Sequence, residues 1–390
     1  MDSIILAGGF ATRLRPLTLT RPKPLLPILD KPLLDWILSD LFLINSLNKV
    51  MFSLHNMADQ IMSHVKNRWF SYEDKLEYFI EEKPLGDGGA LINIIKYLRD
   101  KIDYPLLVLN GDLFMQIDYQ KVINYHEKRG GLMTIVGTYV DDVSKYGFLK
   151  ISDNDVLSEI IEKPKDLVGR EGFVNAGVYI LSEESVNIIL SDEDINKKSL
   201  DYERKISIAK DLIPLLIRKG DVYVYRHDGL WIDIGSPGDY FKANIHAIKI
   251  LCGKNTCADP TAELDSDVKI EDPVFIGRNV RIKNGSVIGS ESILMNDVYI
   301  GRGVYIENSL IMNNTHVEDY SIIRGAIIGE NNRIGRWARI YRETVLGSSI
   351  YIGDHICLPP KTKVLPYKEI NEDICLKYFT DKKEGDNIII

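Results

Sequence analysis

Hydrophobic residues follow two different periodicities along this chain, and the change comes near residue 250. In the first part, short apolar runs alternate with amphipathic segments of helical period. The runs predict strands at Ile4–Leu6, Val50–Leu54, Leu106–Leu109, Leu132–Val136 and Val178–Leu181, and the segments predict helices at Leu33–Leu47, Ala90–Leu98 and Tyr119–Lys128. This alternation predicts a Rossmann-like α/β domain with a mostly parallel sheet. Ligands of such domains bind at the carboxyl ends of the strands.

After Pro260 the apolar residues recur every six positions. The two uninterrupted runs are Ile276, Ile282, Ile288, Leu294, Ile300, Ile306 and then Ile334, Ile340, Leu346, Ile352, Leu358, Val364. Hexapeptide repetition predicts a left-handed parallel β-helix of about five coils, with three hexads in each coil. Between the two runs some steps are one residue shorter, which implies bulged or tightened corners within one core. We therefore predict two domains, 1–250 and 260–390, joined by a helix at Gly238–Leu251.

Composition excludes several classes of partner. The 390 residues are 45% hydrophobic, which is enough for two ordinary cores, and the formal net charge of -8 argues against a general nucleic-acid or anionic-membrane surface. There is no run of about 18 apolar residues and no basic leader at the N-terminus. We expect a cytoplasmic protein without nucleic-acid or membrane partners. The four cysteines form no C-x-x-C pair, so we expect reduced, structural thiols.

The first strand runs directly into Gly8-Gly9, and the cations Arg13 and Lys23 follow. Glycines after a strand let backbone N–H groups approach phosphates closely, and nearby cations neutralise phosphoryl oxygens. Two glycines alone more often form a simple tight turn. The two cations, together with the prolines around Lys23, favour a nucleoside triphosphate site. The segment is neither a Walker A loop nor a dinucleotide-binding fingerprint.

Two acidic residues follow apolar runs that end at the same predicted edge of the sheet. Asp112 lies in Asn110-Gly111-Asp112, and Asp233 lies in Trp231-Ile232-Asp233. A Gly-Asp turn would explain the first of them by itself. A Mg²⁺ ion bound to a triphosphate needs one or two such carboxylates and otherwise keeps water. Asp112 is therefore a candidate Mg²⁺ ligand, and Asp233 is a second acid in a similar position.

The segment from Gly8 to Leu25 resembles the N-terminal signature of the sugar-1-phosphate nucleotidyltransferases, G-G-x-G-T-R-L-R-P-L-T followed by P-K-P-L. Further family motifs are matched in order by Lys145-Tyr146-Gly147, Glu162-Lys163-Pro164 and Asn175-Ala176-Gly177. The C-terminal repeats most resemble those of the mannose-1-phosphate guanylyltransferase branch. One departure is Ala11, which replaces the second loop glycine. It must either keep a negative φ or accept a strain of about 1 kcal/mol.

The resemblance implies a role for each matched residue. The catalytic set is Arg13, Lys23, Asp112 and Asp233, with Asp112 and Asp233 as metal ligands. The nucleotide-binding set is Leu6, Ala7, Gly8, Gly9, Thr12, Arg13, Lys23, Glu82, Gly86 and Asn110. The sugar-phosphate-binding set is Gly147, Glu162, Lys163 and Asn175, with a glycine that admits the sugar ring and a lysine for its phosphate.

Base recognition involves the loop Glu82-Lys83-Pro84-Leu85-Gly86-Asp87, which resembles the base-binding loop of the guanylyltransferase branch. Asp87 replaces the usual threonine. Its carboxylate could accept hydrogen bonds from guanine, or it could cap the helix predicted at Ala90–Leu98. We favour the helix cap.

These observations predict Mg²⁺-dependent transfer of a nucleotidyl group from a nucleoside triphosphate to a hexose 1-phosphate, with GTP and mannose 1-phosphate as the preferred pair. The alternatives are a thymidylyl-, uridylyl- or adenylyltransferase acting on glucose 1-phosphate, and a regulatory subunit that binds a nucleotide-sugar without turnover. Acyl transfer on the β-helix would need a histidine base, and His316 and His355 there are better explained as surface residues. Apolar residues beyond the repeat, including Trp337 and Tyr351, predict a homo-oligomer formed through the β-helix.

Overall fold

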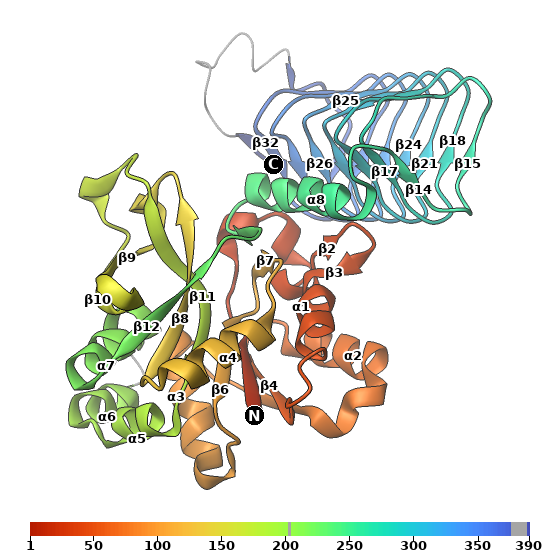
Figure 1. Cartoon of the computed structure of the whole chain (residues 1–390). Helices are drawn as coiled ribbons and strands as arrows, with labels where there is room; N and C mark the ends of the chain where they lie inside the picture. The colour runs from red at the N-terminus through yellow and green to blue at the C-terminus, as the bar shows by residue number, and fades with distance from the viewer. Residues whose placement is uncertain (202–203, 376–387) are drawn as a thin grey trace. The chain divides into compact units, whose positions relative to one another are not determined.

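The computed structural model describes residues 1–201, 204–375 and 388–390, which fold as two units (Figure 1). The first unit contains Met1–Phe10 and Leu33–Asp233. The second contains Ala11–Pro32 and Ile234–Ile390. The domain boundaries that we predict from the sequence, 1–250 and 260–390, stay a prediction.

The first unit is built on a mixed sheet whose central part is parallel. Strand β1 pairs in parallel with β4 on one side and β6 on the other, and β5 extends the sheet beyond β4. Strand β11 is antiparallel to β6, β8 and β9, and β12 is parallel to β8. The strands are β1 Asp2–Leu6, β4 Lys49–Leu54, β5 Leu76–Ile80, β6 Leu106–Asn110, β8 Met133–Val140, β9 Gly147–Ile151, β10 Leu157–Glu162, β11 Gly172–Leu181 and β12 Val222–His227. The predicted mostly parallel α/β fold is confirmed.

Seven α-helices are described in this unit. They are α1 Leu33–Leu41, α2 Ala58–Arg68, α3 Asp87–Leu98, α4 Tyr119–Arg129, α5 Glu183–Ser191, α6 Glu193–Leu200 and α7 Ile213–Lys219. Apolar residues of α3, α5 and α7 join the strands in one core cluster. Helix α1 ends six residues before the predicted Leu47, because the chain there folds into turns held by backbone bonds such as Ile44 N–H to Leu41 O at 3.0 Å.

Three strands end together at one edge of the sheet. Leu6 lies beside Ser53 of β4 and Asn110 of β6, so the loops that follow these strands all begin at the same edge. Gly111 N–H donates to Leu6 O at 2.8 Å, which ties the loop after β6 to the end of β1. A side chain at Gly111 would collide with Ile5 and Ala7. The sheet therefore brings together the two loops that the sequence selects.

The second unit contains a parallel β-helix, in agreement with the hexapeptide pattern. Its short strands form three stacked parallel sheets of eight, seven and six strands among the described residues. They are β14 Cys257–Ala258, β15 Glu263–Leu264, β16 Lys269–Ile270, β17 Val274–Ile276, β18 Arg281–Ile282, β19 Val287–Ile288, β20 Ser292–Leu294, β21 Tyr299–Ile300, β22 Tyr305–Glu307, β23 Leu310–Ile311, β24 His316–Val317, β25 Ile322–Arg324, β26 Ile327–Ile328, β27 Arg333–Ile334, β28 Arg339–Ile340, β29 Val345–Leu346, β30 Tyr351–Ile352, β31 Cys357–Leu358, β32 Thr362–Val364, β33 Glu369–Ile370 and β34 Ile388–Ile389. The residues of both apolar runs are fully or almost fully buried in one continuous cluster.

The shortened repeats change the length of a coil without interrupting its core. Val274 pairs with Ser292, eighteen positions later, whereas Ile293 pairs with Leu310, seventeen positions later. The register returns to eighteen where Ile327 pairs with Val345. The prediction that the shortened steps leave one unbroken core is therefore confirmed.

The small residues at the corners serve close packing between coils. A Cβ atom at Gly335 would lie 2.6 Å from the carbonyl carbon of Gly353 in the next coil, so only glycine fits there. The left-handed backbone conformation falls two residues later, at Trp337, whose φ is 59°. Glycine at position 335 is thus required by contact rather than by φ.

Residues 11–32 belong to the second unit, although residues of the first unit precede and follow them in sequence. They contain the hairpin strands β2 Pro27–Ile28 and β3 Lys31–Pro32. Helix α8, Pro237–Cys252, holds this segment through Asn244 Oδ1, which accepts from Leu29 N–H at 2.8 Å. Arg21 donates to Glu330 on the β-helix at 2.6 Å. The segment is therefore anchored to both parts of its unit.

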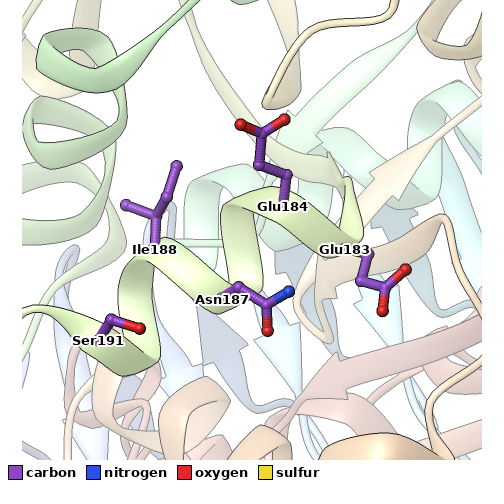
Figure 2. Close-up of a pocket in the computed structure, with 5 residues that line it drawn as sticks. All are labelled: Glu183, Glu184, Asn187, Ile188 and Ser191. Carbon is purple, nitrogen blue, oxygen red and sulfur yellow. The ribbon is translucent and has the colours of Figure 1, made fainter.

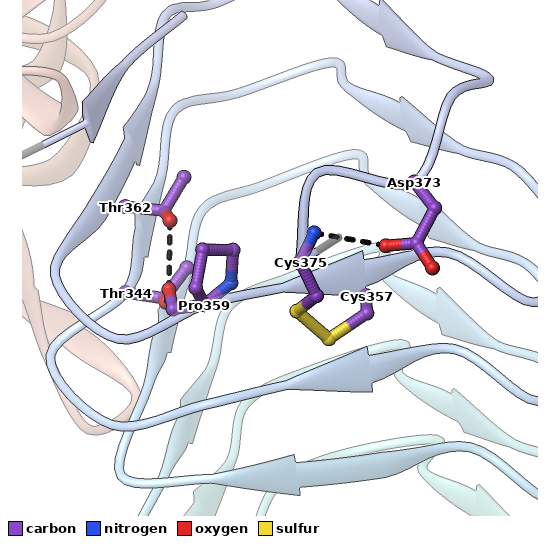
Figure 3. Close-up of a disulfide and its surroundings, with 6 residues drawn as sticks. All are labelled: Thr344, Cys357, Pro359, Thr362, Asp373 and Cys375. Carbon is purple, nitrogen blue, oxygen red and sulfur yellow. Dashed lines mark hydrogen bonds between the residues drawn. A yellow bond between two sulfur atoms is a disulfide. The ribbon is translucent and has the colours of Figure 1, made fainter. Parts of the chain in front are cut away.

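The expectation of reduced thiols is wrong in this structure. The four cysteines form two disulfides, Cys252–Cys257 and Cys357–Cys375. Figure 3 shows the second bond, with Cys375 N–H donating to Asp373 Oδ1 at 2.9 Å. No C-x-x-C motif signals these pairs because the partners meet only when the chain turns, at the end of α8 and across the last coil of the β-helix.

Candidate active site

The loop after β1 passes close to two side chains from neighbouring strands. A Cβ atom at Gly8 would lie 3.2 Å from Glu81 Oε1 and 3.3 Å from His55 Cβ. Glu81 is 7% exposed and accepts from Ser53 Oγ at 2.7 Å and from Leu85 N–H at 3.1 Å. Gly9 has open space where a side chain would stand. The backbone at Gly9 is accessible to a ligand, and a side chain at Gly8 would fit only tightly.

The next part of the predicted loop belongs to the second unit, where Ala11 has φ 47° and ψ 43°. Of the two possibilities for this departure from the family, the strained left-handed conformation is the one that occurs. Thr18 Oγ1 donates to Ala11 O at 2.9 Å and helps to hold it. The strain is about 1 kcal/mol.

The two predicted phosphate-binding cations differ in their surroundings. Arg13 is exposed, and its guanidinium lies against Gly235, where a Cβ atom would be 3.2 Å from Nη2. Lys23 is only 8% exposed and opens a 3₁₀ turn, Lys23–Leu25. Thr12 is exposed beside Arg13. The structure thus gathers these three residues within the second unit.

The two predicted metal ligands lie on one antiparallel ladder. Asp112 directly precedes β7, Leu113–Met115, and Asp233 is the last residue of β13, Trp231–Asp233. These strands pair so that Asp233 lies opposite Leu113. Both carboxylates are half-buried. The fold therefore places next to each other two acids that are more than a hundred residues apart in sequence.

Three of the four predicted sugar-phosphate residues converge on neighbouring strands. Glu162 at the end of β10 pairs with Gly147 at the start of β9. A Cβ atom at Gly147 would lie 3.0 Å from Glu162 Oε2 and 3.4 Å from Asn175 Cβ. Because Gly147 has no side chain, the space beside Glu162 and Asn175 stays open. This arrangement offers a carboxylate and an amide to a polar ring.

Lys163 follows this cluster in a left-handed conformation, with φ 49°. Its N–H donates to Tyr146 O at 2.9 Å, and its Nζ lies 3.6 Å from Glu162 Oε1. The lysine side chain is 62% exposed. A cation therefore stands beside the Glu162 carboxylate and remains open to an anionic ligand.

Two hydrogen bonds and one close contact connect Asn175 to the end of β6. Asn175 Nδ2 donates to the buried Tyr179 hydroxyl at 2.8 Å, and Asn175 Oδ1 accepts from Gly177 N–H at 2.9 Å. Burial raises the pKa of Tyr179, which keeps its hydroxyl neutral. Gly177 has φ 77° and packs against the Asn110 amide, where a Cβ atom would lie 2.6 Å from Nδ2. The orientation of Asn175 is thus fixed by its neighbours.

The predicted capping role of Asp87 is wrong. Helix α3 begins at Asp87 itself, and its N-cap is Gly86 with φ 82°. Asp87 Oδ1 accepts from Gly88 N–H at 2.9 Å and from Ile208 N–H at 3.1 Å. Burial raises the pKa of this carboxyl. Asp87 therefore connects the base-loop segment to Ile208, while Glu82 stays exposed and Gly86 lies tightly against Ile206 O.

The sequence assigned no role to two further residues of this region, His55 and Trp231. His55 Nδ1 is 2.8 Å from Glu81 O, and the His55 ring meets Phe10 edge-on. Trp231 donates through Nε1 to Ala176 O at 3.0 Å and packs edge-on against Tyr146. The position of His55 directly after the apolar run Val50–Leu54, at a strand's carboxyl end, is the signal that could have identified it.

A large surface hollow of about 430 Å³ lies elsewhere, along one side of α5 (Figure 2). Glu183, Glu184, Asn187, Ile188 and Ser191 line it, and all five project from that helix. None of the predicted site residues contributes. Its carboxylates would repel phosphates, so we assign no role to it in the candidate site.

Comparison with known proteins decides the family. The model of the family described as "Nucleotidyl transferase" matches residues 2–249, and that described as "GMPPB C-terminal domain" matches residues 270–379. The chain belongs to the nucleotidyl transferase family. This nucleotidyl transferase is 31% identical over 396 residues to the mannose-1-phosphate guanyltransferase of Debaryomyces hansenii, with 96% of this chain and 98% of that protein covered. It is thus an enzyme.

Two further similarities each cover part of this nucleotidyl transferase. It is 36% identical over 296 residues to a protein of Sulfolobus acidocaldarius named "Putative mannose-1-phosphate guanyltransferase", covering 75% of this chain and 76% of that one. HddC from Yersinia pseudotuberculosis, a solved structure, has 32% identity and a TM-score of 0.51, and the match covers 63% of this chain and 99% of HddC. Within the described part of the nucleotidyl transferase, no helix has the length and apolarity needed to cross a membrane.

Proposed function

We propose that this enzyme transfers a nucleotidyl group from GTP to mannose 1-phosphate, giving GDP-mannose and pyrophosphate. The observation that carries the proposal is the convergence of Gly147, Glu162 and Asn175 in the same unit as the paired acids Asp112 and Asp233. The names of the relatives supply the preferred substrates.

Sugar recognition would rest on the cluster around Gly147. Glu162 Oε2 would accept hydrogen bonds from ring hydroxyls, and the Asn175 amide would both accept and donate hydrogen bonds. Lys163 would bind the 1-phosphate, since its ammonium group is exposed beside Glu162. Tyr179 would act as a positioning residue, because its hydroxyl holds the Asn175 amide.

The nucleophile in this reaction is already an anion. A phosphate oxygen of the sugar 1-phosphate would form a bond to the α-phosphorus, while the bond from that phosphorus to the bridging oxygen breaks and pyrophosphate leaves. No general base is required, so catalysis would consist of alignment and charge neutralisation. Arg13 and Lys23 would supply positive charge, and the backbone from Leu6 to Gly9 would bind phosphoryl oxygens.

Asp112 and Asp233 would hold Mg²⁺. Two half-buried carboxylates on adjacent strands suit a hard cation that also keeps water and phosphate oxygens. Bound there, the ion would neutralise charge on the phosphoryl groups. Base recognition would fall to Glu82 and the backbone near Gly86, because Asp87 already accepts two backbone N–H groups.

A substrate matrix tests this function. GTP, ATP, UTP and dTTP would each be combined with the 1-phosphates of mannose, glucose and N-acetylglucosamine, with pyrophosphate release as the readout. We expect the highest kcat/KM for GTP with mannose 1-phosphate. A higher value for another pair would replace the substrates, and binding without turnover for every pair would favour a regulatory subunit.

We also propose that the β-helix mediates self-association. Tyr320 and Trp337 are 45% and 50% exposed and stack with ring centroids 4.6 Å apart, and His355 continues the stack. A second copy would cover this aromatic surface. Light scattering should give a dimer or larger assembly that Trp337→Glu reduces, and a monomeric wild type would contradict the proposal.

A further inference from the structure

A second cavity lies inside the second unit, between the start of α8 and the outer face of the β-helix. Its volume is about 400 Å³, and it is more enclosed than the hollow on α5. None of the residues predicted for the active site lines it. The volume falls in the range of pockets that hold small organic ligands.

Two lysine side chains bring positive charge to the cavity. Lys361 and Lys363 both line it and are half-buried. Within residues 1–201, 204–375 and 388–390, neither ammonium group forms an ion pair or a hydrogen bond, whereas Lys49, Lys150 and Lys198 each have a carboxylate partner. Two half-buried cations on the wall of one cavity repel each other, and an anion between them would relieve this repulsion.

Apolar and acidic groups restrict which anion fits. Phe241 of α8 and the side chains of Ile327 and Val345, which are 6% and 3% exposed, give the cavity an apolar wall. Glu343 contributes an exposed carboxylate that likewise has no ion pair with a described residue. A carboxylate repels a bare anion but accepts hydrogen bonds from hydroxyl groups. A ligand with a phosphoryl group, hydroxyls and an apolar ring face satisfies all three surfaces.

We propose that this cavity is a second ligand site, which binds a small phosphorylated sugar. The phosphoryl group would lie between Lys361 and Lys363, with a hydroxyl toward Glu343 and the ring face against Phe241. The site stands on residues independent of the proposed active site.

Calorimetric titration of the full chain with mannose 6-phosphate tests the proposal. Its phosphate is on the wrong carbon for the nucleotidyl transfer described above, so binding can be measured without turnover. The double substitution Lys361→Met/Lys363→Met should weaken binding roughly tenfold or more, and each single substitution about threefold. Lys269→Met, an exposed lysine on another sheet of the β-helix, is the matched control and should leave binding unchanged.

Further titrations show which groups of the ligand contribute to its binding. Inorganic phosphate should bind more weakly than mannose 6-phosphate, and Glu343→Gln should strengthen phosphate binding about threefold by removing the repulsion. Unphosphorylated mannose should not bind measurably. Absence of mannose 6-phosphate binding at millimolar concentration would overturn the proposal. So would binding that Lys163→Met weakens and the double substitution does not, because the ligand would then occupy the candidate sugar site.

Discussion

The two units of this protein enforce unusual backbone conformations in different ways. In the β-helix, a left-handed residue recurs at successive corners, and residues as different as Asn314, Trp337 and Lys361 occupy equivalent places. In the first unit, left-handed residues follow no repeat, and Lys163 is held by a bond of its own, from its N–H to Tyr146 O at 2.9 Å. A repeated conformation is supported by the coils on either side, so it accepts almost any side chain. An isolated one depends on particular neighbours.

This difference predicts that single substitutions in the first unit change activity, while those in the β-helix change stability.

The largest effect should come from the two acids Asp112 and Asp233. Asp112→Asn and Asp233→Asn should each lower kcat by about 10²-fold or more, because each removes a carboxylate proposed to hold the metal. Steady-state kinetics at saturating Mg²⁺ measure this, with the exposed Asp166→Asn as control. Near-normal turnover would remove that residue from the site.

A core substitution in the β-helix should show the opposite pattern. Ile300 is fully buried in the middle of the stack, so Ile300→Ala should lower the free energy of unfolding by about 2–5 kcal/mol, and Ile300→Val by about 0.5–1.5 kcal/mol. Denaturant unfolding monitored by circular dichroism gives both values. The kcat of the folded enzyme should stay unchanged, and a proportional loss of kcat would show that the two units are not separable in this way.

A smaller effect should separate the two substrates. Lys163→Met should raise KM for the sugar 1-phosphate about tenfold and leave KM for the nucleotide unchanged, because the lysine stands beside Glu162. Lys23→Met should instead impair nucleotide binding. The neighbouring Lys165→Met serves as the control. Identical KM changes in the Lys163 and Lys23 variants would contradict the division of the site.

The smallest expected effect is on how the free energy of unfolding depends on pH. It tests whether His126, a buried residue of the first unit, affects stability alone. Burial lowers the pKa of His126 to about 4, below its ordinary value of 6.5. The unfolded chain therefore binds this proton more readily, so stability is fully present above pH 6.5 and falls as the pH drops toward 4. Between about pH 7 and 5 the loss should be about 1–2 kcal/mol. His126→Asn should flatten that part of the stability profile, and an unchanged slope would assign it to other groups.

The sequence predicted most of the architecture because the period of the apolar residues stays recognisable even where single repeats are one residue shorter. The hexad repeat located the buried residues of the β-helix, and even its shortened steps had the predicted outcome. What the pattern could not reveal depends on contacts between distant segments. The disulfide partner of Cys357 and the bond from Ile208 to Asp87 are examples, since neither leaves a periodic signal.

The candidate site shows the same limit. Motifs selected Gly147, Glu162 and Asn175 one by one, and the fold shows that they meet. His55 and Glu81 were missed because a histidine after a strand and one of two adjacent glutamates are common in ordinary turns. Their significance comes only from their distance to Gly8.

The packing of residues 11–32 has a consequence for the order in which the protein is made. Arg21 donates a hydrogen bond to Glu330, which lies 309 positions later in the sequence. Thr20 is hydrogen-bonded to Ser348, which lies 328 positions later. At a synthesis rate of roughly 5–20 residues per second, the early segment emerges roughly 15–60 s before these partners. Arg13 and Lys23 lie in that segment, so their final surroundings form only after the β-helix residues that the segment contacts have been synthesised.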